Sequence, residues 1–165
     1  GDKGRRARFF ENGGGEIQDK TGEYSELKLR RALTNSRMLS CDVSAGYDPS
    51  YAGMFEKKNA AYLGKGVCFN KYTGSRGKSG SNDANAEFMG KLRAVMEAGK
   101  VVYQTAELGK GDQGGGGTVA AYMGNRNIDT LDAGVPVLSM HAPMEIVSKL
   151  DCYMTMKGMR AVYHD

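Results

Sequence analysis

The stretch IDTLDAGVPVLSM occupies residues 128–140, and His141 follows it directly. A short, largely apolar run of this kind predicts a strand region. Beyond the histidine, residues 148–163 (SKLDCYMTMKGMRAVY) carry apolar side chains at helical spacing and predict a methionine-rich amphipathic helix. The chain therefore ends with a strand region, a histidine and a helix.

The same alternation of strand and helix is predicted upstream. Further strands are expected at residues 38–43, 66–72 and 100–108. Helices are expected at residues 25–36 with Ser25 as N-cap, from about residue 82 to a stop at Gly99, and in residues 118–125. This order indicates an α/β fold with three α/β/α layers and a largely parallel sheet.

Composition limits the class of protein. The 165 residues are 40% hydrophobic, which suits one globular domain with its own core. No apolar stretch reaches the roughly 18 residues of a membrane helix, and the first residues lack a secretory signal, so we expect a cytoplasmic protein without a membrane partner. A net charge of +4 is modest and argues against a nucleic-acid partner. The scattered cysteines are expected to be reduced, buried and free of zinc: Cys41, Cys68 and Cys152.

Asp42 and His141 are candidate metal ligands. Functional groups of a parallel sheet gather beyond the carboxyl ends of its strands, and each residue lies near the end of a predicted strand. A carboxylate and an imidazole are ligands that zinc takes in proteins. The residue types leave alternatives open, because a lone histidine is often structural and a lone strand-end aspartate often caps a turn.

The loop GSRGKSGSN, residues 74–82, resembles a phosphate-binding loop between a strand and a helix. However, Tyr72 stands where the pattern G-x-x-x-x-G-K-[ST] requires glycine. A flexible basic loop, or a basic edge to a cleft that receives an acidic group, would explain the same residues.

The run DQGGGGT, residues 112–118, leads into a predicted helix. Its unhindered backbone N–H groups could hold an anion or a developing oxyanion. Four glycines would equally serve a tight strand-to-helix connection in which side chains would clash. Both interpretations stay open at the level of the sequence.

Four longer strings together resemble a known family. They are LSCDVSAGYDP, KYTGSRGKSGSNDANAEF, AELGKGDQGGGGTVAAYM and DAGVPVLSMHAPMEIVSKLDCYMT. Over residues 16–163 the chain resembles the C-terminal half of the aspartyl-aminopeptidase-type zinc metallopeptidases, especially the bacterial, clostridial-like members. The resemblance implies a cytoplasmic aminopeptidase that acts on peptides, carries two zinc ions per active site and assembles as a tetrahedral dodecamer. It also implies that residues 1–165 are the C-terminal part of the catalytic domain, without the dimerisation domain.

The resemblance assigns roles to five residues. Asp42 in SCDV resembles the aspartate ligand of one zinc, and His141 in SMHAP resembles the histidine ligand of the other. Gly117 and Thr118 would lie beside the bound substrate, and Lys71 in KYTG would line the cleft.

The first 15 residues diverge from the family. Its members carry Asp-Lys-Glu-Glu, in which one glutamate is the general base and the next a zinc ligand. Asp2 and Lys3 keep the start of this motif, but Gly4 and Arg5 replace both glutamates. We therefore expect no catalytic base in this chain and an inactive 165-residue polypeptide. The alternative is a non-catalytic assembly module that keeps the fold and the oligomer contacts.

Overall fold

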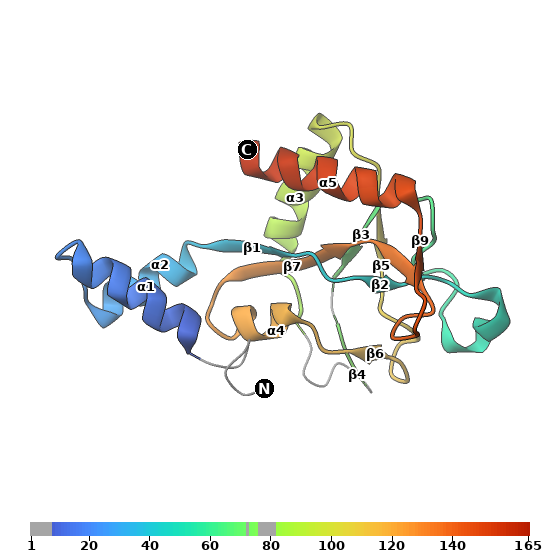
Figure 1. Cartoon of the computed structure of the whole chain (residues 1–165), viewed down its shortest axis with the longest axis horizontal. Coiled ribbons are helices and arrows are strands. Elements are labelled where there is room, and N and C mark those ends of the chain that lie inside the picture. Colours follow the sequence, from blue (N-terminus) through green and yellow to red (C-terminus); the bar gives the residue numbers. More distant parts are fainter. Residues whose placement is uncertain (1–7, 72, 76–81) are drawn as a thin grey trace.

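The computed structural model describes residues 8–71, 73–75 and 82–165 (Figure 1). It has the predicted α/β class. The helices are α1 Phe9–Lys20, α2 Glu26–Thr34, the 3-10 helix η1 Pro49–Met54, α3 Ala86–Ala98, α4 Val119–Gly124 and α5 Lys149–His164. The strands are β1 Arg37–Ser40, β2 Ser44–Ala45, β3 Val67–Asn70, β4 Gly74–Ser75, β5 Tyr103–Ala106, β6 Gly115–Gly116, β7 Asp129–Gly134, β8 Pro136–Leu138 and β9 Ile146–Val147.

The main sheet has the strand order β1-β7-β3-β5. β1 pairs with β7 and β3 pairs with β5 in parallel, as expected, whereas the central β7–β3 pairing is antiparallel. A second sheet, β2-β8-β9, continues the β1–β7 pair, because β2 again lies parallel to β8. The two chain segments that lead to Asp42 and to His141 therefore run side by side.

Helices cover the main sheet on two sides (Figure 1). α3 and α5 lie together on one face, where Val67, Phe69, Leu92, Met96 and Leu131 form the centre of the apolar core. α4 lies on the opposite face, next to β7 and β1. The predicted three-layer arrangement is thus present.

Several predicted helix ends are confirmed. The Ser25 hydroxyl accepts from the Lys28 backbone N–H, at 3.1 Å, and so caps α2. Gly99 ends α3, but α3 begins at Ala86 rather than near residue 82, because the Asn85 side chain caps it by accepting from the Phe88 N–H. The 16 residues of α5 form the predicted final helix.

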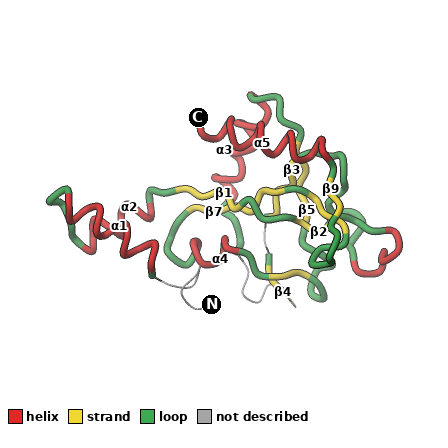
Figure 2. Tube along the Cα trace, viewed as in Figure 1, coloured by secondary structure: helices red, strands yellow, loops and turns green. Residues whose placement is uncertain are grey.

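α1 is a helix that the pattern analysis lacked. Together with α2 it forms a hairpin that extends from the start of β1 away from the sheet (Figure 2). α1 contains the glycine run of residues 13–15, a composition that costs a helix about 1 kcal/mol per glycine relative to alanine. Gly15 lies buried against the Tyr24 ring, so the missing side chain lets the hairpin close.

The cysteines are free, but the expectation that all three are buried is wrong. Cys68 lies inside β3, and burial raises the pKa of its thiol to about 11. Cys41 is exposed because the chain leaves the sheet after β1, and Cys152 is exposed on α5. None of the described helices is long and apolar enough to cross a membrane.

Candidate functional site

Three strands end at one row of residues across the sheet. Ser40, Asn70 and Ala106 are the last residues of β1, β3 and β5, and the strand register aligns them through Asp132 of the longer β7. Asp132 is 1% exposed, and Asn70 and Ser40 are also buried. The antiparallel β7–β3 pairing produces this convergence, because β1 and β3 approach the row from opposite directions.

Asp132 is the charged centre of this row. The Thr118 hydroxyl donates to its Oδ2 at 2.7 Å. Burial raises the pKa of the Asp132 carboxyl above its ordinary range, the Ser40, Thr118 and Thr73 hydroxyls oppose the shift, and the charge of Asp42 adds to it. The Oδ1 atom of Asp132 is buried without a hydrogen-bond partner among the described residues. A carboxyl group in this setting favours its protonated form more than an exposed aspartate does.

The glycine run comes to this row through strand pairing. β6 pairs antiparallel with β4, and the Thr73 and Thr118 hydroxyls lie 3.4 Å apart beside that pairing. Gly115 has a φ of +100°, and a side-chain carbon there would lie 1.7 Å from the Gly74 carbonyl oxygen. The close backbone approach therefore accounts for glycine at this position. The anion-binding interpretation gains no support from α4, which has only six residues.

Asp42, a predicted ligand, lies beside Asp132. It occupies the short connection between β1 and β2, is half-buried, and accepts from the Val43 N–H at 2.9 Å. The negative charge of Asp42 contributes to the raised pKa of Asp132, and Asp132 accepts a hydrogen bond from Thr118. The structure thus binds Thr118 to Asp132 and places the Asp42 backbone beside Gly134, two residues beyond Asp132; Gly117 itself is exposed.

His141, the other predicted ligand, lies farther along the chain in the exposed loop between β8 and β9. Its φ is +68°, and its backbone N–H donates to Glu145 Oε1 at 2.6 Å. A carboxylate and an imidazole suit zinc, but a catalytic zinc takes three protein ligands. No group of three His, Cys, Asp or Glu residues able to hold a metal forms within the described ranges. These residues alone do not complete a zinc centre.

Lys71, a predicted cleft residue, follows β3 and lies two residues before Thr73. Its ammonium pairs with the Asp83 carboxylate and donates to the Ala84 carbonyl oxygen at 2.7 Å. β4, which follows Lys71 by three residues, pairs with the glycine run, but the charged end of Lys71 is directed to the start of α3.

Two sequence hypotheses concern residues outside the described ranges. The basic part of the suspected phosphate loop occupies residues 76–81, and the altered Asp-Lys-Glu-Glu motif lies within residues 1–7. The suspected phosphate loop begins with Gly74 and Ser75, which the structure does describe and which form β4.

Pattern analysis missed Asp132 and the hydroxyl residues Ser40 and Thr73 that act on its carboxyl. A usable signal existed for Asp132, since it is a carboxylate within the apolar run LDAGVPV, and a buried carboxylate requires hydrogen-bond donors. Ser40 and Thr73 carry no comparable signal, because only strand register and loop pairing bring them to Asp132.

Comparisons with known proteins match almost the whole chain. The model of the aminopeptidase I zinc metalloprotease family, M18, matches residues 1–163. A Clostridium acetobutylicum protein described as a probable M18 family aminopeptidase 1 is 55% identical over 98% of this chain and 35% of its own length. The crystal structure of an M18 family aminopeptidase from Thermotoga maritima is 40% identical, with a TM-score of 0.91 over 98% of this chain and 36% of that one.

A more distant structure shares the fold alone. It is described as the mApe1 dodecamer of Saccharomyces cerevisiae and is 15% identical, with a TM-score of 0.74 over 99% of this chain and 34% of that one. The present chain thus spans about a third of the length of the curated relatives that it matches. The extent and identity of these matches show that the chain belongs to the M18 family of zinc metalloproteases, the aminopeptidase I type.

Proposed function

We propose that the chain is part of the catalytic domain of a metal-dependent aminopeptidase that releases N-terminal residues from peptides in the cytoplasm. Residues 1–165 would form the C-terminal part of that domain. Family membership supports the reaction class. The observation that carries the proposal is that the end of the glycine run binds buried Asp132, where three strands end, while Asp42 follows the end of β1 that pairs with Asp132.

Asp42 and His141 would each supply one ligand to a two-zinc centre whose other ligands lie outside the described residues. Asp42 is half-buried beside the row, and His141 is exposed and accessible. A bound zinc ion would lower the pKa of a water molecule and polarise the scissile carbonyl group. Because Gly4 and Arg5 replace the expected glutamates, the general base would have to come from elsewhere.

The peptide substrate would lie along Gly117, Thr118 and Lys71. The hydroxyl of Thr118 is already engaged by Asp132, so its backbone is the part available to a substrate. Lys71 could turn toward a peptide at little cost, because its partner Asp83 is largely exposed and exposed ion pairs contribute at most about 1 kcal/mol.

A second candidate function is that of a non-catalytic assembly module. The changes at Gly4 and Arg5 favour it, as does the exposure of large apolar side chains on α1, among them Phe9 and Ile17. Self-association has a parallel in the dodecamer described for a protein of the same fold. In this case the chain would keep subunit contacts and lack peptidase activity.

Zinc titration by calorimetry tests the metal site in the purified chain. We expect weak binding that Asp42→Asn and His141→Gln each weaken at least tenfold, since each removes one of two ligands. The matched controls are Asp19→Asn in α1 and His164→Gln in the last turn of α5, both exposed and remote from the row. Equal zinc binding by all four variants would reject the assignment.

A peptidase assay tests the expected inactivity of the chain, and zinc binding together with the oligomeric state separates the two candidate functions. The pure 165-residue chain should release no amino acids from peptides, because two ligands without a base do not make a catalytic centre. Chelator-sensitive release by that chain would contradict this expectation. Zinc binding that is lost in both ligand variants supports the aminopeptidase proposal, whereas oligomers without zinc binding support the assembly module.

A further inference from the structure

Asp132 is a buried carboxylate that the proposed metal and substrate contacts do not use. It is 1% exposed, and no lysine or arginine within the described ranges forms an ion pair with it. An aspartate in such a place is costly unless hydroxyl or amide donors satisfy it. Its Oδ2 accepts from the Thr118 hydroxyl, whereas its Oδ1 is buried without a hydrogen-bond partner among the described residues. The Ser40 and Thr73 hydroxyls act on the same carboxyl, so its position links three separate segments of the chain.

The Thr118 side chain binds Asp132 in place of the usual helix-capping hydrogen bond. It is the N-cap residue of α4, where a threonine hydroxyl ordinarily accepts from a backbone N–H of the first turn. Here the side chain makes no such cap bond and donates to Asp132 instead. The residue is 5% exposed, so its hydroxyl has no access to bulk water as an alternative partner. The end of the glycine run is therefore anchored to β7 rather than to its own helix.

Asp151 provides an internal comparison. This second buried carboxylate, fully inaccessible in α5, accepts from the Gly64 and Gly66 backbone N–H groups at 2.7 Å each. Asp151 holds the segment that enters β3, whereas Asp132 holds the segment that leaves β6. Each carboxylate fixes a glycine-containing segment, and the two sets of contacts are separate.

We propose that Asp132 is a positioning residue that fixes Thr118 and the preceding glycines against the end of β1, where Asp42 lies. The role of that loop beside a substrate rests on the proposed function. The anchoring itself rests on the Thr118–Asp132 hydrogen bond, on the Thr73–Thr118 contact and on the β4–β6 pairing. Without the anchor, exposed Gly117 would lose its fixed place relative to Asp42.

Hydrogen exchange of single backbone amides, measured by NMR on the 165-residue chain, tests this anchor. Thr118→Val keeps the shape and removes the donor, and Thr118→Ser restores it. We expect Thr118→Val to speed exchange in residues 114–118 by about tenfold, the worth of one hydrogen bond, and Thr118→Ser to stay within about twofold of the parent chain. Asp132→Leu removes the acceptor and should act like Thr118→Val, and combining the two substitutions should add nothing further.

Asp151→Asn is the matched control. It should speed exchange at residues 64–66 and leave residues 114–118 unchanged. Two results would overturn the proposal: amide exchange in Thr118→Val that is faster throughout the chain, or exchange in residues 114–118 that is no faster than in the parent chain. If Asp132→Leu fails to fold, the pair Thr118→Val and Thr118→Ser still decides the question, because both leave the carboxylate in place.

Zinc titration of the same variants separates this inference from the proposed function. Thr118→Val should bind zinc as the parent chain does, since neither proposed ligand is altered. Absence of zinc binding in every variant would count against the metal centre and leave the exchange result standing. Loss of zinc binding in Thr118→Val alone would contradict a purely positioning role.

Discussion

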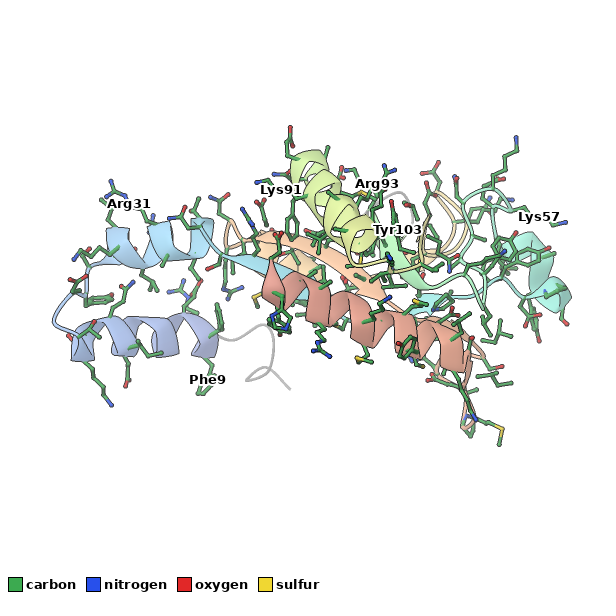
Figure 3. All side chains as sticks on the ribbon, turned by 90° about the horizontal axis from the view of Figure 1, so that it is seen from above. Phe9, Arg31, Lys57, Lys91, Arg93 and Tyr103 are labelled. Carbon is green, nitrogen blue, oxygen red and sulfur yellow. The ribbon has the colours of Figure 1, made fainter. Side chains whose placement is uncertain are left out.

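Compared with the α1–α2 hairpin, the four-stranded sheet keeps its large apolar residues covered. Phe69 and Leu131 are fully buried beneath α3 and α5, whereas Phe9 and Ile17 on α1 are 81% and 68% exposed. Phe9 lies at the start of the hairpin, far from the α3–sheet region where Arg93 Nε donates to the Tyr103 hydroxyl (Figure 3). The sheet has a core of its own, and the hairpin leaves apolar surface available for other contacts.

Leucine truncation in each region should give the largest difference. Leu131→Ala removes a fully buried side chain from β7 and should lower the free energy of unfolding by about 2–5 kcal/mol. Leu29→Ala in α2 removes a half-buried one and should cost about 1 kcal/mol or less. Urea unfolding followed by circular dichroism measures both, and equal losses would show that the hairpin is packed as firmly as the sheet.

The pH dependence of stability should distinguish the buried row from the surface. Because the pKa of Asp132 is raised in the folded state, the folded chain holds this proton to a higher pH than the unfolded chain does. The stabilisation that this proton gives to the folded chain is complete below the pKa that Asp132 has in the unfolded chain. It is lost as the pH rises through the higher pKa that Asp132 has in the folded chain. Relative to Asp132→Asn, the parent chain should therefore gain stability as pH falls from 7 toward 4. Urea midpoints at several pH values provide the measurement, and a constant difference would contradict it.

The ion pair between the hairpin and the sheet region should have a smaller, local effect. Glu11 Oε1 of α1 lies 2.8 Å from Arg126 Nε after α4, and both side chains are mostly covered. Glu11→Gln should lower the free energy of local opening of α1 by about 1 kcal/mol and so speed amide exchange there, with little change in the exchange of β7. Glu26→Gln, which removes an exposed pair with Arg30, is the control and should cost under about 0.5 kcal/mol.

Glycine replacement in α1 should give the smallest change, and in the stabilising direction. A side-chain carbon at Gly13 would meet no atom within 4 Å, so Gly13→Ala should stabilise α1 by about 0.5–1 kcal/mol. At Gly15 the same carbon would lie 3.3 Å from the Tyr24 ring, and the gain should shrink or reverse. Amide protection along α1 would reveal the difference between the two variants.

The sequence predicted those parts of the fold that depend on local pattern. The Ser25 cap, the Gly99 stop and the final helix follow from side chains within a few residues of one another. α1 was missed because its glycines oppose a helix locally, and packing against Tyr24 and Leu29 of the hairpin outweighs that preference.

The candidate site was predictable only in part. Asp42 was selected from its place at a strand end and again through family resemblance, which also selected Gly117 and Thr118; in the structure Thr118 binds Asp132 and Asp42 follows the end of β1 that pairs with Asp132. The sequence offered a signal for Asp132 itself, but its surroundings come from the sheet, because Ser40 and Thr73 are far away in the sequence and reach it by register and loop pairing. The roles of Asp42, His141, Lys71, Gly117 and Thr118 remain predictions for the experiments above.

The placement of β7 between β1 and β3 has a consequence for biosynthesis. Arg37 of β1 pairs with Asp129 of β7, 92 residues later in the chain. At about 5–20 residues per second, a ribosome needs several seconds to make the intervening segment. During that interval β1 has no partner within the main sheet, and its edge is open to other extended chains. The nascent chain should therefore depend on chaperone protection until β7 emerges, and slow decoding of residues 41–128 should increase aggregation.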